Sequence, residues 1–124
     1  MAEKKKLLIV EDDALTREGM GLVLRRAGYD PMLAANGQEA LACLGSWPRP
    51  DLVVLDMLMP VLDGWQFLAK LKGLPLPAVP IIVISSIGLS DDWAKDHGCR
   101  SFVKKPIDPD DLIEEVRRCL EVYK

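Results

Sequence analysis

The chain has 124 residues, 49% apolar and 28% charged, and its 16 basic and 19 acidic side chains give a net charge of −3. This length fits one domain, and the mildly acidic balance gives no reason to expect direct contact with nucleic acid. No apolar stretch approaches the roughly 20 residues of a membrane span and no signal-peptide pattern opens the chain. We therefore expect a cytoplasmic protein without a membrane partner.

The first predicted elements follow an N-terminal segment, residues 1–5, that we expect to be flexible. A fully apolar run at 7–10 predicts a strand that is buried on both faces. Residues 14–27 have helical periodicity, with Gly28 as the stop signal. The apolar residues predicted to share the buried side of this helix are Leu15, Met20, Leu22 and Val23.

A second strand is predicted at residues 29–34. It contains Pro31, which cannot donate a hydrogen bond to a neighbouring strand, so we place it at an edge of the sheet. The helix after it begins at Asn36, with Glu39 three residues further on, as in a capping box. A second fully apolar run, at 52–55, predicts the third strand.

The second half of the chain repeats this alternation of strand and helix. Its last helix has the clearest start, because Asp108 is a preferred N-cap residue and proline is favoured at the first helical position. The pattern predicts an α/β fold, a single doubly wound (βα)5 domain over residues 1–124 with helices on both faces of a parallel sheet. The elements predicted here are a helix after Gly64, a strand at 81–84, a short helix at 90–96, a strand at 101–103 and a helix from Pro109.

Acidic residues follow two of the apolar runs. Glu11 and Asp12 come directly after the run at 7–10, and Asp56 comes directly after the run at 52–55. Ligands of such folds bind at the carboxyl ends of the strands, where these carboxylates would meet and repel one another. Because Mg²⁺ is bound by one or two carboxylates, waters and phosphate oxygens, we expect a Mg²⁺ pocket that is open to a phosphoryl group. Asp13 is predicted to cap the following helix instead.

The other two strand ends carry groups that suit a phosphoryl ligand. Ser85 supplies a hydroxyl after the run at 81–84, and Lys105 supplies an ammonium group after the strand at 101–103. A carboxylate nucleophile, a divalent cation, a lysine and a hydroxyl are the components of phosphoryl transfer. Ser86 is predicted to pack inside the protein.

Together these segments resemble bacterial response-regulator receiver domains over essentially the whole chain. The most specific is the string Asp-x-x-Met-Pro-x-x-Asp-Gly from Asp56 to Gly64. The resemblance implies a flavodoxin-like fold with strand order 2-1-3-4-5. The other matching segments, in the order that the family has, are Leu-Leu-Ile-Val-Glu-Asp at 7–12, Ile-Ser-Ser at 84–86 and Lys-Pro at 105–106.

The resemblance also implies a role for each site residue. Asp56 is the phosphoacceptor. Asp56 and Asp12 bind Mg²⁺ directly, Glu11 binds it through water, and Leu58 binds it through its backbone carbonyl. Mn²⁺ can substitute for Mg²⁺. Lys105 and Ser85 act on the phosphoryl group. Ser85 and Phe102 are the switch residues, and the peptide bond between Lys105 and Pro106 is expected to be cis, which only proline permits at low cost.

By the same resemblance, a histidine kinase or a histidine phosphotransfer protein donates the phosphoryl group. Phosphorylation changes the face formed by the helix at 90–96, the strand at 101–103 and the last helix. That face regulates a downstream protein or output domain and is where a phosphorylation-dependent dimer would form. The chain is not expected to be an enzyme beyond its own phosphorylation and dephosphorylation.

Two features of the sequence carry predictions specific to this chain. The stretch from Ser85 to Lys105 is about two residues shorter than usual, roughly half a helical turn, which predicts a fourth helix that is short, shifted or irregular. The positions two after the acceptor and two after the switch hydroxyl are Leu58 and Ile87, which are both apolar. Neither side chain can hold a water for hydrolysis, so we expect slow self-dephosphorylation.

Other functions fit the residues less well. A haloacid-dehalogenase-type hydrolase would have Asp-x-Asp, and position 58 is Leu. A flavodoxin-like cofactor binder would have a phosphate loop after the first strand, where Glu11 and Asp12 would repel phosphate. The third alternative is an interaction module that works without phosphorylation. A stand-alone receiver and one cut from a larger protein are both compatible with the sequence.

Overall fold

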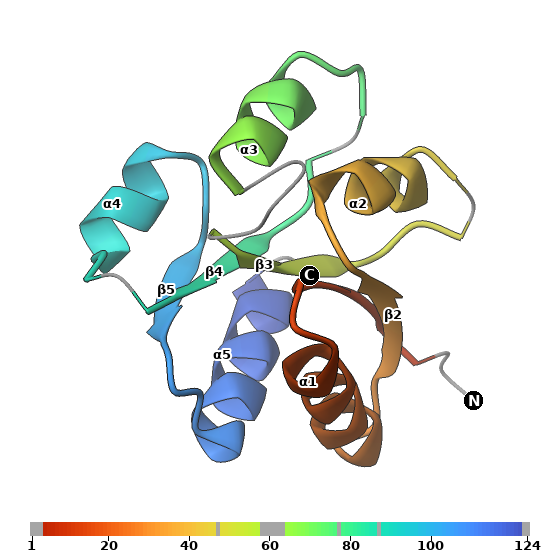
Figure 1. Cartoon of the computed structure of the whole chain (residues 1–124), viewed down its shortest axis with the longest axis vertical. Coiled ribbons are helices and arrows are strands. Elements are labelled where there is room, and N and C mark those ends of the chain that lie inside the picture. The colour runs from red at the N-terminus through yellow and green to blue at the C-terminus, as the bar shows by residue number, and fades with distance from the viewer. Residues whose placement is uncertain (1–3, 47, 58–63, 77, 87, 123–124) are drawn as a thin grey trace.

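The computed structural model describes residues 4–46, 48–57, 64–76, 78–86 and 88–122. Within these residues, five parallel strands form one sheet of order β2-β1-β3-β4-β5, as predicted (Figure 1). The strand that contains Pro31 lies at an edge of this sheet, also as predicted. The strands are β1 (Lys6–Val10), β2 (Asp30–Ala34), β3 (Leu52–Asp56), β4 (Ile81–Ser85) and β5 (Ser101–Lys104).

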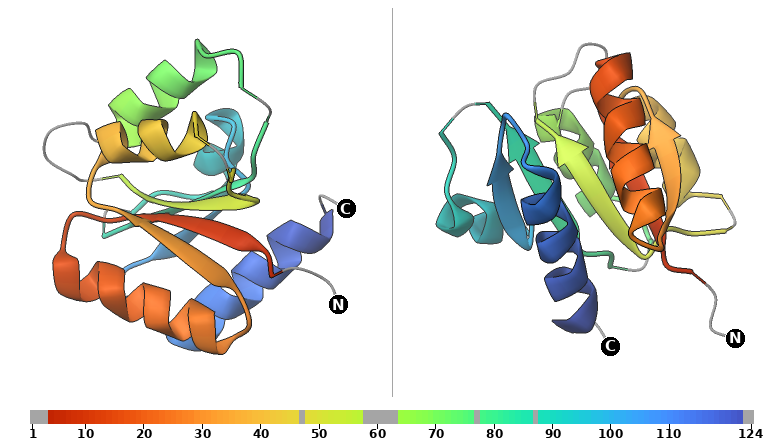
Figure 2. Two further views of the ribbon diagram at one scale, coloured as in Figure 1. Left: turned by 90° about the vertical axis from the view of Figure 1, so that its right-hand side faces the viewer. Right: turned by 90° about the horizontal axis from the view of Figure 1, so that it is seen from below.

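In the part of the chain that the structure describes, five helices cover the two faces of the sheet. Helices α1 and α5 lie on one face, and α2, α3 and α4 lie on the other (Figure 2). The continuous apolar strands supply side chains to a separate core on each face, which explains why β1, β3 and β4 read as unbroken hydrophobic runs. No described helix is long and apolar enough to cross a membrane. The helices are α1 (Ala14–Arg26), α2 (Gly37–Leu44), α3 (Gly64–Lys72), α4 (Asp91–Asp96) and α5 (Pro109–Val122).

The residues predicted to be N-caps cap their helices in the structure. Asp13 accepts hydrogen bonds from the backbone N and the Oγ1 of Thr16, at 2.9 and 2.6 Å. Asn36 accepts from the backbone N of Glu39 at 2.9 Å, and Asp108 accepts from that of Asp110 at 2.8 Å. Each cap satisfies a backbone donor that has no partner within its helix and so fixes the end of the helix next to a strand.

The predicted buried side of α1 is wrong in part. Met20 and Leu24 are buried, but Leu15 is 82% exposed and Leu22 is 47% exposed. Leu15 and Leu22 are seven residues apart and share a stripe of the helix, whereas Met20 lies five residues from Leu15, about 140° further round. The sheet therefore buries one stripe of α1, and a second apolar stripe faces the solvent.

Candidate functional site

Three carboxylates meet at the carboxyl edge of the sheet. Strands β1 and β3 are parallel neighbours with Val10 opposite Leu55. Glu11 and Asp56, the residues that follow this pair, therefore lie side by side. Carboxylate oxygens of Glu11, Asp12 and Asp56 all lie within 4.8 Å of one another. Glu11 and Asp56 are buried, whereas Asp12 is exposed. Two of the three carboxylates are therefore shielded from solvent, and the third is accessible to it.

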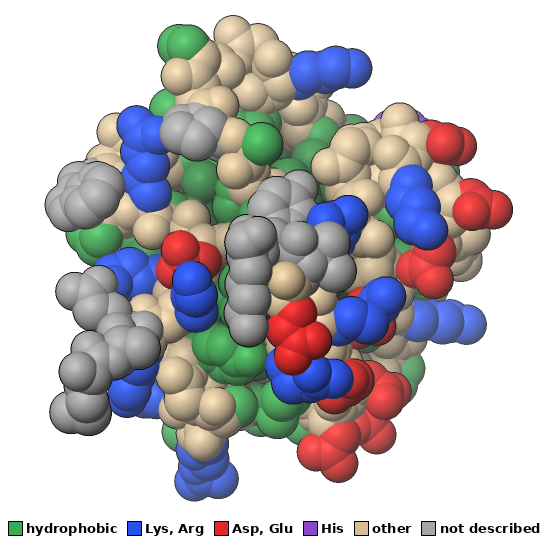
Figure 3. All heavy atoms as spheres, turned by 180° about the vertical axis from the view of Figure 1, so that it is seen from behind, with side chains coloured by type: hydrophobic (Ala, Val, Ile, Leu, Met, Phe, Trp, Pro, Cys, Tyr) green, Lys and Arg blue, Asp and Glu red, His purple; other side chains and the backbone are tan. Residues whose placement is uncertain are grey.

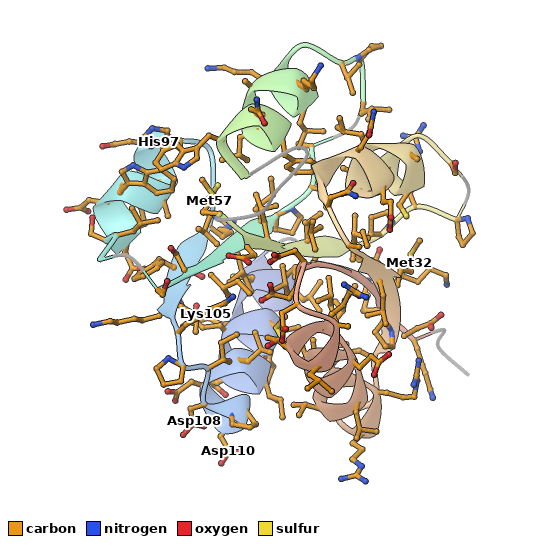
Figure 4. All side chains as sticks on the ribbon, viewed as in Figure 1. Met32, Met57, His97, Lys105, Asp108 and Asp110 are labelled. Atoms are coloured by element: carbon orange, nitrogen blue, oxygen red, sulfur yellow. The ribbon has the colours of Figure 1, made fainter. Side chains whose placement is uncertain are left out.

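A lysine enters this cluster from the end of β5. Its Nζ lies 2.6 Å from Oε1 of Glu11 and 3.3 Å from Oδ2 of Asp56. The backbone N of Lys105 also donates to the carbonyl of Ser85 at 3.0 Å, and the peptide bond from Lys105 to Pro106 is cis. Figure 4 shows Lys105 between the end of β5 and the start of α5. The lysine thus joins three strands that are distant in the sequence.

The charges of the site are unbalanced. Desolvation raises the pKa of Asp12, and the hydrogen bond and repulsion from Glu11 raise it further. Burial by itself lowers the pKa of Lys105, but the hydrogen bond to Glu11 and the attraction of Asp56 outweigh it, so the pKa is raised. Three carboxylates against one ammonium group leave an excess of two negative charges. A set of carboxylate oxygens with this excess suits a hard divalent cation such as Mg²⁺.

Of the remaining predicted site residues, the structure describes Ser85 and Phe102. Ser85 is the last residue of β4 and is fully buried, and its neighbour in the sheet is Lys104. Phe102 is half-buried and packs against the core under α4. Ser86 is exposed, so the prediction that it packs inside is wrong: the strand ends at Ser85 and the chain turns outward. Leu58 and Ile87 lie outside the described residues.

Gly64 is a structural contributor whose contact with the acceptor strand could not be deduced from the sequence. Its backbone N donates to the carbonyl of Met57 at 3.2 Å. A Cβ at this position would lie 2.7 Å from Cα of Met57 and 3.0 Å from the carbonyl oxygen of Asp56. The start of α3 therefore lies directly against the backbone that carries Asp56. The signal in the sequence was a glycine after an aspartate, which predicts only a turn.

A pair of glycine substitutions tests this close approach. We expect Gly64→Ala to lower the free energy of unfolding by about 1–3 kcal/mol, because the new methyl group meets backbone that cannot move aside. Gly19→Ala is the matched control, since nothing lies within 4 Å of a Cβ there and Gly19 is inside α1. It should raise stability by about 0.5–1 kcal/mol. Urea unfolding measures both, and equal effects would contradict the packing role of Gly64.

Comparisons with known proteins agree with this geometry. A family model described as the response regulator receiver domain matches residues 7–117. The chain is 37% identical over 124 residues to the response regulator Rre1 of Synechocystis. The match covers 97% of this chain and 53% of that protein. It is 30% identical to the protein PilH of Pseudomonas aeruginosa, with 93% of this chain and 97% of PilH covered. The chain spans about half the length of several of the curated relatives that it matches, Rre1 among them.

Solved structures give the same result. The receiver domain of Francisella response regulator 1452 superposes with a TM-score of 0.87 at 26% identity, covering 98% of this chain and 100% of that one. The signal receiver domain of a signal transduction histidine kinase from Syntrophus aciditrophicus has a TM-score of 0.84 at 33% identity, with 97% and 92% covered. Similar receiver domains therefore occur both in response regulators and within a histidine kinase.

Proposed function

Because the chain belongs to the response-regulator receiver domain family, we propose that it is a signalling switch that accepts a phosphoryl group on Asp56. The observation that carries this proposal is the placement of Asp56. It is 2% exposed at the end of a central strand, with a lysine Nζ 3.3 Å from its Oδ2 and two more carboxylates beside it. This arrangement provides a nucleophile together with charged groups that can stabilise a phosphoryl group.

The proposed reaction is a transfer from the phosphohistidine of a histidine kinase or a phosphotransfer protein. An oxygen of the Asp56 carboxylate attacks phosphorus, the new P–O bond forms, and the P–N bond breaks as the imidazole leaves. Lys105 neutralises charge on the phosphoryl oxygens, and the hydroxyl of Ser85 donates a hydrogen bond to one of them. The chain acts only on itself in this reaction and in the later hydrolysis, so we do not regard it as an enzyme.

Mg²⁺ is the cofactor that the site would take. Asp12 and Asp56 would bind it directly and Glu11 through water, and the carbonyl of Leu58, outside the described residues, completes the proposed set. When bound, the cation offsets the negative charge of the carboxylates and of the incoming phosphoryl group. Mn²⁺, which also prefers oxygen ligands, is expected to substitute.

A surface beside the site fits the phosphoryl donor. Leu15 is 82% exposed in the first turn of α1, close in sequence to Asp12. An apolar groove of about 390 Å³ runs from α1 to Lys105 and Pro106. We propose that the donor protein covers this groove and Leu15, which would hold its phosphohistidine over Asp56 in the cytoplasm.

The proposed output is a change of the face formed by α4, β5 and α5. The acyl phosphate would draw Ser85 toward it, and Phe102 would fill the space that is vacated. Phe102 is well placed for this because its backbone N donates to Oδ1 of Asp91, in α4, at 3.1 Å. The helix α4 has six residues and is as short as predicted. The partner proposed to respond to this change is a downstream protein, an output domain or a second copy of the chain.

One experiment tests both the transfer and its proposed persistence. The chain is incubated with Mg²⁺ and acetyl phosphate, the donor is removed, and the mass is followed over time. We expect the mass of one phosphoryl group to be added and to persist for hours, because the apolar side chains of Leu58 and Ile87 cannot hold a water for attack. No uptake would contradict the proposed function, whereas uptake with a half-life of seconds would contradict only the slow hydrolysis.

A further inference from the structure

A cleft of about 640 Å³ opens between α3 and α4, away from the carboxylate cluster. Its apolar lining comes from Leu68 and Leu71 of α3 and from Ile81 of β4. Trp65, at the start of α3, also lines it and is 40% exposed. A cleft of this size with an apolar floor and an exposed tryptophan has the properties of a binding site for a ligand or for the anchor side chains of a partner.

Three aromatic rings pack together beside the cleft, and two of them, Trp65 and His97, line it. Trp65 packs edge-to-face on Trp93 with ring centroids 4.9 Å apart, and Trp93 stacks on His97 at 4.1 Å. The imidazole is held in place because its Nδ1 lies 2.8 Å from the carbonyl oxygen of Trp93. Figure 4 shows His97 at the C-terminal end of α4, the end that is nearest to α3. Trp65 is therefore held in position before any partner binds, which lowers the entropic cost of binding.

The charge around the cleft has the opposite sign to that of the chain. Lys72 and Lys95 stand exposed at its rim, against one acidic residue, Asp96. The whole of α3 contains Lys70 and Lys72 and no acidic residue. In a chain with a net charge of −3, the charged side chains that line this cleft, two lysines and one aspartate, leave a net charge of +1.

A second hollow, lined by β5, α5 and the loop between them, is acidic by comparison. A groove of about 320 Å³ between β5 and α5 is lined by four carboxylates and one lysine. In Figure 3, Asp and Glu side chains gather on the right, the side of α4, β5 and α5 in that view. The two hollows therefore favour partners of opposite charge. The carboxylates of the acidic groove are Asp108, Asp111, Glu114 and Glu115.

We propose that the cleft between α3 and α4 is a docking site for an acidic segment of a partner protein. An aromatic or leucine side chain of that segment enters the cleft beside Trp65, and its carboxylates pair with Lys72 and Lys95. This interaction goes beyond the proposed phosphoacceptor function, since none of its residues belongs to the carboxylate cluster. Burial beside the tryptophan supplies affinity, and the lysines select an acidic partner.

The test is a selection of random phage-displayed peptides on the immobilised chain, followed by fluorescence anisotropy with the enriched peptides. We expect these peptides to carry Asp or Glu beside an aromatic residue or leucine. The double variant Lys72→Glu/Lys95→Glu should weaken their binding by about tenfold or more, equivalent to about 1.4 kcal/mol. Trp65→Ala should weaken it by a similar factor.

The matched control is Lys4→Glu/Lys5→Glu, which makes the same change in net charge at an exposed N-terminal segment. It should leave binding within about twofold, and Asp56→Asn should do the same. Circular dichroism checks that each variant is folded. Enrichment of basic peptides, an absence of enrichment, or equal losses in the two charge-reversal variants would overturn the docking site. None of these outcomes bears on phosphorylation, which is measured separately by mass.

Discussion

An Asp56→Asn chain is expected to take up no detectable phosphoryl group and to give no Mg²⁺-dependent fluorescence response to beryllofluoride, a mimic of the acyl phosphate. The amide has no charged oxygen to attack phosphorus and is a poorer ligand for Mg²⁺. In the unchanged chain a response is expected because α3 begins against the backbone of Met57, with Trp65 as its second residue. Intact mass with acetyl phosphate and tryptophan emission with beryllofluoride measure the two effects.

The control for this substitution is Asp30→Asn, which makes the same chemical change at the exposed start of β2. It should leave both uptake and fluorescence unchanged. Uptake by the Asp56→Asn chain at the unchanged rate would place the acceptor elsewhere. A fluorescence response that needs Mg²⁺ but survives Asp56→Asn would show that Trp65 senses a different cation site.

Much of the fold could be predicted because local signals agreed with one another. The fully apolar runs became the three central strands, and Pro31 marked an edge strand. Asn36 and Asp108 became N-caps because short polar side chains there satisfy backbone donors, a rule that depends on only a few neighbouring residues. The buried side of α1 was predicted less well, since Leu15 and Leu22 are apolar but face away from the sheet. Hydrophobicity does not show which stripe of a helix is covered.

The site was predictable only as far as its topology. Parallel strands with acidic ends had to bring Glu11 and Asp56 to one edge, and the structure places them there. Lys105 and Glu11, which pair at 2.6 Å, are 94 positions apart in the sequence. No pattern of neighbouring residues predicts a contact over that separation. The same limit applies to the cleft beside Trp65, which depends on how α3 and α4 are placed across the sheet.

The second large effect is expected from Lys105→Met. Removing the ammonium group leaves Glu11, which is fully buried, without its ion-pair partner beside two other carboxylates. Breaking a buried pair on one side costs about 3–5 kcal/mol, and because the lysine is 25% exposed we expect a loss of about 2 kcal/mol. Phosphoryl uptake should fall by about a hundredfold, since a group that stabilises the transferring charge is lost. Urea unfolding and intact mass measure these changes.

The lost stability of Lys105→Met is explained either by the lost charge or by lost packing, and its dependence on charge distinguishes the two. Because the pKa of Lys105 is raised in the folded chain, its stabilisation is fully present at neutral pH and is lost only as the pH rises beyond the ordinary lysine value of about 10.4. Mg²⁺ should restore stability to Lys105→Met, as should a second change, Glu11→Gln, because each reduces the negative charge. Lys104→Met, an exposed neighbour, should change neither stability nor uptake. If neither Mg²⁺ nor Glu11→Gln restored stability, the lysine would act through its packing and not through its charge.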